Sequence, residues 1–311
     1  MNIGIEIGGT KLQIAIGYPE TGKIETLFRF DVEKDKGATG ILDKIEVTLN
    51  QLSQRPASIG VGFGGPINRK TGIIATSHQI GGWSGFDLKN WLLERYPLES
   101  LAIDNDANTA ALGEAWFGAG RGFEQQFYVT LGSGVGGGMV VNKHLYHGNA
   151  PGEAEIGLLF LDKSGNTLES FCSGWALDAK IRAVISQLPA DSILKRMIET
   201  SQTAEAKSLL PALQQGDHAA LGIFQEYADN LAWGLSQVVH LFNPQVIVLG
   251  GGVSLLGSPL AAAVQQALPR YLAKVYQPGP VVRISELSEE VVLVGALCLL
   301  HQKNKGRNEQ P

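Results

Sequence analysis

The sequence predicts an α/β protein of two domains, and three observations carry that prediction. The chain has 311 residues, a length that suits two domains better than one. Short apolar runs typical of buried strands alternate with segments whose apolar residues recur at helical spacing. A strand–glycine turn–strand pattern occurs twice, at residues 5–11 and 130–138. Because the order of elements restarts at the second occurrence, the chain contains a weak internal repeat.

The elements of the first repeat follow from the spacing of apolar residues in chain order. Ile41, Ile45 and Leu49 recur as they would on one face of a helix. The expected strands lie at residues 2–8, 11–17, 25–31, 59–63 and 101–103, and the expected helices at 39–53, 87–96 and 107–117.

The second repeat opens with strands at residues 127–131 and 136–142 and a short strand near Leu145. A helical stretch is expected after it at about 168–188, followed by helices at 191–200, 205–214, 217–242, 258–273 and 290–302, with strands at 246–249 and 281–285. Pro244 ends the long helix because the residue before a proline disfavours helical geometry. The polar segment 303–311 is expected to be disordered.

The composition is that of a globular protein, with 44% hydrophobic and 18% charged residues and a net charge of −5. No long basic stretch occurs, so we expect no nucleic-acid partner, and no apolar run has membrane-spanning length. Cys172 and Cys298 lie far apart, which favours a reducing compartment over a disulfide framework or a zinc site. Since a strand is predicted from residue 2, we expect no signal peptide and a cytoplasmic protein.

The tips of the two glycine turns are candidate anion sites. Without Cβ atoms, Gly8-Gly9 and Gly132-Ser133-Gly134 allow a phosphate to approach bare backbone N–H groups. Thr10 and Lys11 can add further donors. An ordinary tight hairpin explains either turn taken alone. Two such turns with an Asp-bearing segment between them favour two lobes that hold one polyphosphate.

Asp106 lies in that intervening segment, after a predicted strand and at the start of a predicted helix. One interpretation is structural, because Asp and Asn are common helix N-caps. The other is a general base at the carboxyl end of a strand, where open α/β sheets bind ligands. A carboxylate there can accept the proton of a sugar hydroxyl during phosphoryl transfer. The spacing supports both interpretations.

Three further features carry paired interpretations. Glu155 and Glu169 are either solvated surface carboxylates or acceptors for the hydroxyls of a polyol. The glycines at 250–252 form either a tight strand-to-helix connection or a close backbone approach to a nucleotide. The sequence leaves each of these choices open.

Taken together, these segments resemble the ROK family of sugar kinases and repressors, within the hexokinase–actin–Hsp70 superfamily of ATPases. The resemblance runs from Gly4 to about Leu300. Residues 6–11 resemble the family's Asp-x-Gly-Gly-Thr-Lys, residues 60–66 its Gly-x-Gly-x-x-Gly-Pro, and Asn105-Asp106-Ala107-Asn108 its most diagnostic tetrapeptide. The further matches are residues 132–138, 173–177 and 243–252, and Gly295-Ala296.

The resemblance implies the two-lobed actin-like (ribonuclease H-like) fold, with a smaller lobe of residues 1–115 and about 291–311 and a larger lobe of residues 116–290. It also implies ATP and Mg²⁺, with Asp106 as the general base and Glu6 in contact with Mg²⁺ through water. The implied sugar-binding residues are Gly65, Gln79, Asn105, Asp106, Glu155 and Glu169. The implied ATP-binding residues are Gly8, Gly9, Thr10, Lys11, Thr130, Gly132, Ser133, Gly134, Gly251 and Gly252.

The sequence departs from the family pattern at four places. Glu6 replaces the usual Asp, so its carboxylate stands one methylene further out. Residues 159–168 replace a Cys-rich zinc loop and contain no cysteine, so we expect no structural zinc. Leu158 stands where the family has His, and Gln79, near Trp83, stands for the usual Asn. The last two departures change the part that recognises the sugar.

Three functions agree with these residues. The first is an ATP-dependent kinase of a hexose, with glucose as first choice, then fructose or mannose, then an N-acetylated amino sugar. That order rests on the family alone. The second is a kinase fold with a repurposed pocket, which Leu158 and the missing zinc loop motivate. The third is a non-catalytic, sugar-responsive regulator, although a strand from residue 2 leaves no place for a helix-turn-helix. We expect a homodimer in each case.

Overall fold

The computed structural model describes residues 1–77, 80–149, 152–200 and 205–308 and divides into two compact units. Unit 1 comprises Met1–Tyr128, Gly138–Ala154 and Glu286–Pro311, and unit 2 comprises Val129–Gly137 and Glu155–Ser285. The lobe limits expected at residues 115 and 291 remain a prediction. The compact units differ from them mainly by keeping residues 116–128 and 138–154 in unit 1.

The first sheet belongs to unit 1 and has the strand order β3-β2-β1-β4-β5. The strands are β1 (Asn2–Ile7), β2 (Lys11–Tyr18), β3 (Lys23–Asp31), β4 (Ser58–Phe63) and β5 (Ser100–Asn105). β1, β2 and β3 pair antiparallel, whereas β4 and β5 continue the sheet in parallel. All five strands expected in the first repeat are therefore confirmed.

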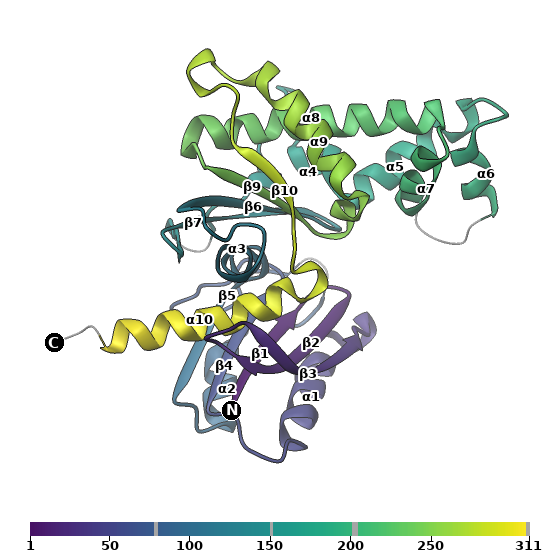
Figure 1. Cartoon of the computed structure of the whole chain (residues 1–311). Coiled ribbons are helices and arrows are strands. Elements are labelled where there is room, and N and C mark those ends of the chain that lie inside the picture. The colour runs from purple at the N-terminus through teal and green to yellow at the C-terminus, as the bar shows by residue number, and fades with distance from the viewer. Residues whose placement is uncertain (78–79, 150–151, 201–204, 309–311) are drawn as a thin grey trace. The chain divides into compact units, whose positions relative to one another are not determined.

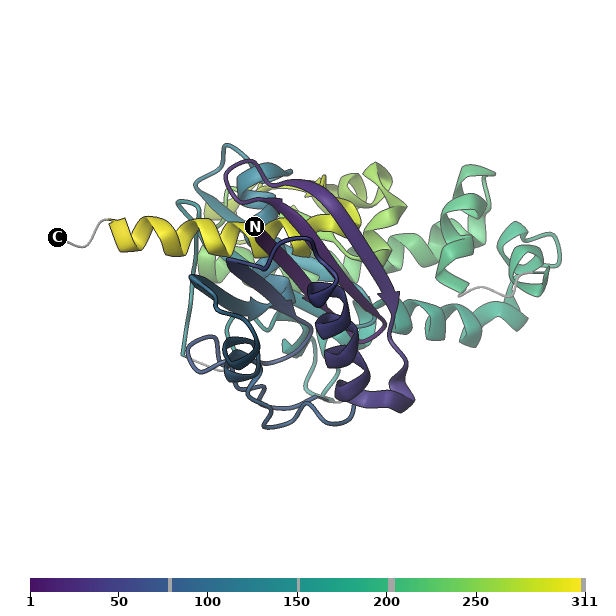
Figure 2. The same cartoon turned by 90° about the horizontal axis from the view of Figure 1, so that it is seen from below.

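Side-chain alternation gives this sheet two different faces. Ile3 and Ile5 join a buried apolar core with Ile41 of α1 (Gly37–Asn50) and Leu92 of α2 (Leu88–Arg95). The opposite face packs against α3 (Asp106–Phe117) and α10 (Val291–Asn308). Figure 1 shows these elements, and Figure 2 shows α1 in purple and α10 in yellow on opposite sides of the strands.

Glycines allow α10 to pack closely within unit 1. Gly4 and Gly60 are partners on neighbouring strands, and a Cβ added to Gly60 would overlap the carbonyl oxygen of Ala296. On the helix, a Cβ added to Gly295 would overlap the carbonyl oxygen of Thr109 in α3. The glycine spacing around Gly60 therefore serves the packing of a helix.

The second sheet has the strand order β10-β9-β6-β7-β8, and the division between the units passes within β6 and β7. Its strands are β6 (Gln125–Leu131), β7 (Val135–Val141), β8 (His144–Leu145), β9 (Val246–Gly250) and β10 (Val281–Ile284). Asn142 and Lys143 join β7 to β8 with positive φ at both positions, as a type I′ hairpin requires.

The remaining helices lie in unit 2. They are α4 (Leu168–Cys172), α5 (Gly174–Val184), α6 (Ile193–Thr200), α7 (Leu209–Gln214), α8 (His218–Phe242) and α9 (Ser258–Ala267). Across the residues that the structure describes, no helix is both long and apolar enough to cross a membrane.

The helical stretch expected at 168–188 is confirmed, and it consists of α4, α5 and a 3₁₀ turn of Ile185–Gln187. Ser173 divides it, because this residue ends α4 and caps α5 by accepting the Ala176 N–H at 3.1 Å. One expectation about the end of the chain was wrong. The segment expected to be disordered from residue 303 instead continues α10 as far as Asn308. Its lysine and arginine residues have good helix propensity, so polarity alone does not end the helix.

Candidate active site

The junction of β5 and α3 presents Asp106. Asn105 caps α3, because its side-chain oxygen accepts the Asn108 N–H at 2.7 Å. Asp106 is the first residue of the helix, and its Oδ1 accepts the Ala107 N–H at 2.8 Å. The capping role therefore belongs to Asn105, so Asp106 is not required as the cap. The positive end of the helix dipole favours a carboxylate at that position.

Asp106 lies beside two glycine turns of unit 1. A Cβ added to Gly64 would stand 3.4 Å from Asp106 Oδ2 and 3.4 Å from the Cα of Gly8. The Gly64 N–H donates to the Ile7 carbonyl at 2.7 Å, and Gly65 follows with a φ of +151°, a conformation that favours glycine. The ends of β1 and β4 thus meet the start of α3 at the carboxyl ends of parallel strands, where α/β sheets bind ligands.

The first glycine turn is a tight hairpin between β1 and β2. The Gly8 N–H donates to the Lys11 carbonyl at 2.9 Å, and the Thr10 carbonyl accepts the Val32 N–H at 3.0 Å. Gly9 is half-buried and Thr10 is exposed at the tip. An anion can therefore reach the tip of the hairpin without any movement of buried side chains.

Glu6 is buried at the base of this hairpin. Its carboxylate accepts a hydrogen bond from Gln13 Nε2 at 2.6 Å and lies 3.3 Å from Lys11 Nζ. Burial raises the pKa of the Glu6 carboxyl, and Lys11 and Gln13 partly oppose that effect. Gln13 Oε1 is also buried and has no hydrogen-bond partner among the described residues. Carboxylate and amide oxygens are ligands that Mg²⁺ accepts, mostly with water in between, so these residues fit the expected metal contact.

The second glycine turn lies in unit 2 and is fixed from two sides. The Gly132 N–H donates to the Gly134 carbonyl at 2.9 Å, and the Gly174 N–H at the start of α5 donates to the Gly132 carbonyl at 2.7 Å. Glu169 Oε2 accepts the Val135 N–H at 2.8 Å. Glu169 is therefore an anchor of this turn, a role that the sequence did not suggest.

The turn after β9 packs directly on the strand that leads into the second glycine turn. Gly251 has a φ of +81°, and a Cβ there would lie 2.7 Å from backbone atoms of Leu131. A Cβ on Gly252 would meet no atom within 4 Å, and one on Gly132 would meet only the Gly134 carbonyl, at 3.9 Å. Unit 2 therefore brings the two predicted nucleotide-side turns together and leaves space beside both.

The remaining predicted sugar contacts are divided between the units. Asn105 lies in unit 1, whereas Glu155 lies in unit 2, exposed, just before a 3₁₀ turn of Ile156–Leu158. Leu158 is exposed over 63% of its surface. Packing in the core therefore does not explain why this side chain is apolar. Gln79 lies outside the described residues.

Residues 159–168 form a closed loop without cysteine. Asp162 Oδ1 accepts the Ser164 N–H at 2.8 Å and the Asn166 N–H at 3.1 Å, while Oδ2 accepts from Asn166 Nδ2 at 2.6 Å. The Leu161 N–H donates to the Asn166 carbonyl at 2.8 Å. These side-chain and backbone hydrogen bonds organise the loop locally, as Asx turns do.

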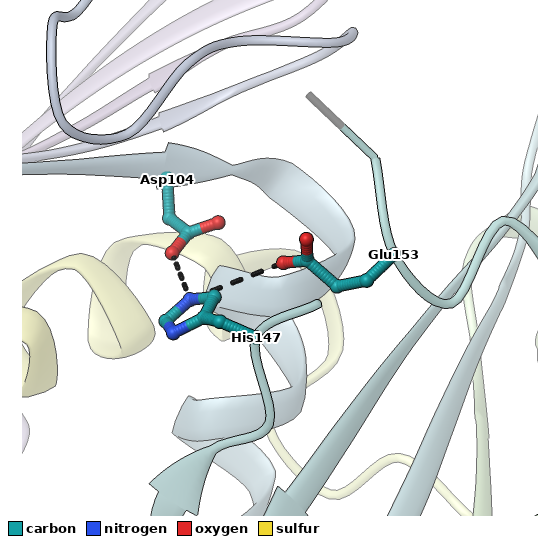
Figure 3. A group of neighbouring side chains, drawn as sticks. All are labelled: Asp104, His147 and Glu153. Carbon is teal, nitrogen blue, oxygen red and sulfur yellow. Dashed lines mark hydrogen bonds and ion pairs between the residues drawn. The ribbon is translucent and has the colours of Figure 1, made fainter. Parts of the chain in front are cut away.

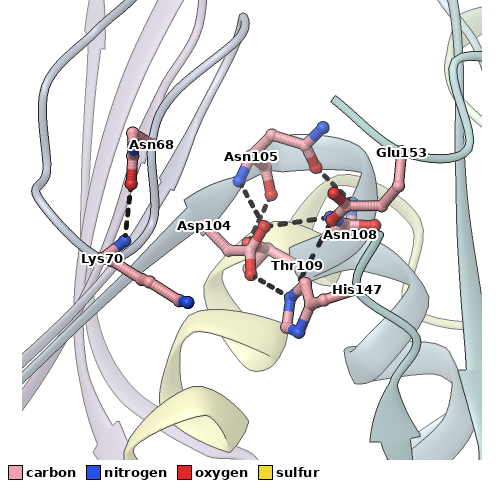
Figure 4. A network of polar contacts seen from close by, with 8 residues as sticks. All are labelled: Asn68, Lys70, Asp104, Asn105, Asn108, Thr109, His147 and Glu153. Atoms are coloured by element: carbon pink, nitrogen blue, oxygen red, sulfur yellow. Dashed lines mark hydrogen bonds and ion pairs between the residues drawn. The ribbon is translucent and has the colours of Figure 1, made fainter. Parts of the chain in front are cut away.

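A cluster of Asp104, His147 and Glu153 lies behind Asn105 in unit 1, and the sequence analysis missed it. His147 Nε2 lies 2.8 Å from Asp104 Oδ2 and 4.0 Å from Glu153 Oε1 (Figure 3). Asn108 Nδ2 donates to both carboxylates, at 3.0 Å to Asp104 and 2.8 Å to Glu153 (Figure 4). His147 stands 43 residues from Asp104 in the chain, so no local motif signals this arrangement.

The fold and the two glycine turns define the actin-like ATPase class of α/β proteins. A family model described as the ROK family matches residues 2–303. The chain belongs to the ROK family.

Individual relatives cover nearly the whole chain. A glucokinase of Thermotoga maritima is 29% identical over 98% of this chain and 98% of its own. The crystal structure of a ROK family glucokinase from Streptomyces griseus, in complex with glucose and AMPPNP, is 29% identical, with a TM-score of 0.84 over 97% of this chain and 99% of its own. A xylose repressor of Caldicellulosiruptor bescii is 25% identical over 86% of this chain and 69% of its own.

Proposed function

We propose that this protein is an ATP-dependent sugar kinase that transfers the γ-phosphoryl group of ATP to a hydroxyl of a hexose. The observation that carries the proposal is the position of Asp106, at the carboxyl ends of parallel strands and beside the Gly8 and Gly64 turns. The glucokinase relatives, one of them solved with glucose and AMPPNP, make glucose the first substrate to test. Fructose and mannose follow.

In this mechanism Asp106 accepts the proton of the attacking hydroxyl as the phosphoryl group is transferred. The Ala107 N–H holds Oδ1 at 2.8 Å, which fixes the direction of the carboxylate. Asn105, Glu155 and Glu169 would hold sugar hydroxyls, and Gly65 is a further predicted sugar contact. Glu169 would use the oxygen that does not accept the Val135 N–H.

The predicted nucleotide contacts lie on the first hairpin in unit 1 and, in unit 2, on the second glycine turn and the turn after β9. Backbone N–H groups at these turns would face the phosphates, with Gly251 and Gly252 near the adenosine. Mg²⁺, when bound near Glu6, would neutralise charge on the phosphates. The predicted contacts are Gly8, Gly9, Thr10, Lys11, Thr130, Gly132, Ser133 and Gly134.

The test is an ADP-release assay with Mg·ATP across hexoses and N-acetylated amino sugars. The Asp106→Asn variant should lose at least about 100-fold in kcat, the usual contribution of a general base, while its melting temperature stays near that of the parent. Asp43→Asn, on the exposed side of α1, is the matched control and should keep full activity. Normal turnover by Asp106→Asn would exclude the assigned base.

A second candidate function is a sugar-responsive regulator or a kinase with a repurposed pocket. The xylose repressor relative favours the regulator, and the exposed Leu158 favours an altered sugar pocket. Nucleotide binding without turnover on any sugar of the panel would support these alternatives. Specific, salt-resistant binding to DNA would support the regulator alone.

We further propose that the protein is a cytoplasmic homodimer without nucleic-acid or membrane partners and without a structural zinc in the 159–168 loop. Two free, buried thiols, Cys172 and Cys298, agree with a reducing compartment. Sedimentation velocity would measure the oligomeric state directly.

A further inference from the structure

We propose that Asp104, His147, Glu153 and Asn108 form a binding site for a divalent transition-metal ion in unit 1. The site is separate from the expected Mg²⁺ contact at Glu6 and from the cysteine loop of the family. It also does not depend on whether the protein phosphorylates sugars.

The donor atoms have the spacing of ligands around one ion. One ligand atom from each of Asp104, His147 and Glu153 lies within 4.8 Å of the others. With metal–ligand bonds of about 2.0–2.2 Å, neighbouring ligands stand roughly 3 Å apart. The measured separations of 2.8 Å and 4.0 Å from His147 Nε2 bracket that spacing, so small side-chain movements would suffice.

Asn108 supplies an independent observation. It is only 1% exposed, its amide is directed at both carboxylates, and its Oδ1 has no hydrogen-bond partner among the described residues. The two ends of an amide are exchanged by a flip about the side chain. Without an ion, Nδ2 donates to both carboxylates. With an ion bound, a flip would turn Oδ1 toward the carboxylates, where it would add an oxygen ligand.

Charge also favours a cation at this position. The side chains of Asp104 and Glu153 are only 7% and 10% exposed, and two poorly hydrated carboxylates are unfavourable without compensation. A divalent ion beside a neutral imidazole would bring the cluster to zero net charge. One imidazole nitrogen with carboxylate and amide oxygens suits Mn²⁺ or Zn²⁺ better than a thiolate-seeking ion.

The position suggests what such an ion would do. Asp104 directly precedes Asn105 and Asp106, and its Oδ1 already accepts the Asn105 N–H at 2.9 Å. An ion bound to Asp104 Oδ2 would tie the end of β5 to the segment that carries His147 and Glu153. The ion would therefore help to position Asp106, the proposed general base, without touching the substrate.

The experiment is a titration of nucleotide-free, chelator-treated protein with Mn²⁺ alone, in which electron paramagnetic resonance measures the free ion. We expect one Mn²⁺ per chain and displacement by Zn²⁺, which binds such ligands more tightly. His147→Ala should weaken binding by more than the roughly 10–100-fold that loss of a supporting partner costs. His144→Ala, an exposed histidine on β8, is the matched control and should bind normally.

Two more variants keep the test decisive. Glu153→Gln preserves an acceptor for Asn108 but removes the charged ligand, so it should weaken Mn²⁺ binding even if His147→Ala fails to fold. Glu6→Gln should leave this binding unchanged. Absence of Mn²⁺ binding in the parent, equal binding in Glu153→Gln, or loss only in Glu6→Gln would each overturn the proposal and leave the cluster as a hydrogen-bonded brace.

Discussion

Glu6 combines a buried position with a charged side chain, and this combination has a measurable consequence. Burial raises the pKa of its carboxyl, so the folded protein holds the proton more tightly than the unfolded chain does. The favourable contribution of protonated Glu6 is therefore complete below its ordinary pKa of 4.5. It is lost as the pH rises through the raised value.

We predict that Glu6→Gln raises the melting temperature at pH 8, because it removes a desolvated charge while keeping an amide beside Gln13. The loss of the ion pair with Lys11 matters less, since that lysine is 40% exposed and such pairs contribute little. The advantage should shrink as the pH falls toward 4. Differential scanning calorimetry between pH 4 and 8 measures it, and a pH-independent difference would show that the charge is not the cause.

At this scale the sequence predicted some roles and not others. It identified Asn105 and Asp106 but could not divide capping from catalysis between them, because both residue types cap helices. The backbone assigns the cap to Asn105. His147 and Glu153 could not be found, since only the tertiary structure brings them to Asp104. The anchoring of the second glycine turn by Glu169 is a long-range contact of the same kind.

Among the elements, α10 depends most strictly on glycine. Gly60 of β4 and Gly295 of α10 each lie against a backbone carbonyl of a neighbouring element. A methyl group at either position has no flexible neighbour to displace, so the helix or the strand itself would have to move.

We predict that Gly60→Ala destabilises the protein by about 3 kcal/mol or more, at the upper end of overpacking effects. The matched control is Gly222→Ala, in the exposed part of α8, where an added Cβ meets nothing within 4 Å. That change should stabilise the protein by about 1 kcal/mol through helix propensity. Urea denaturation of both variants measures the free energies, and equal effects would contradict the packing argument.

The periodicity of apolar residues predicted most strands and helices because each buries one stripe or one face. It located the helical stretch 168–188 but not its division at Ser173, where a hydroxyl caps a new helix. It failed beyond Lys303, where polarity was taken for disorder although the helix continues to Asn308 and contains lysine and arginine, which have good helix propensity. The division and the extension depend on local hydrogen bonding and propensity, which apolar spacing does not report.

For the whole molecule, the notable property is that unit 1 is discontinuous. Its sheet comes from Met1–Tyr128, but α10 comes from Glu286–Pro311, after nearly all of unit 2. The buried side chains of α10 include Leu293, Leu297 and Leu300. Apolar periodicity predicts the helix and does not reveal which sheet it covers, so the limits of the units could not be derived from the residues alone.

We predict that a chain ending at Ser285 leaves unit 1 without a stable native state. The sheet face beneath α10 would be exposed, so the truncated protein should bind the dye 8-anilinonaphthalene-1-sulfonate and lose near-ultraviolet circular dichroism. A chain ending at Gln302 is the control. It retains the buried side chains Leu293, Leu297 and Leu300 of α10 and should melt within a few degrees of the parent. Native behaviour of the shorter chain would show that α10 is dispensable for unit 1.

Because α10 is far from its sheet in the sequence, the two are also synthesised at different times on the ribosome. Residues 155–285 emerge as one uninterrupted stretch that makes up most of unit 2. The strands that support Asp106 emerge earlier, yet they must wait for residues 286–308 before their glycine-lined face is covered. Nascent chains stalled before residue 286 should therefore present that face to chaperones, and synonymous codons that slow elongation in this region would lengthen the exposure.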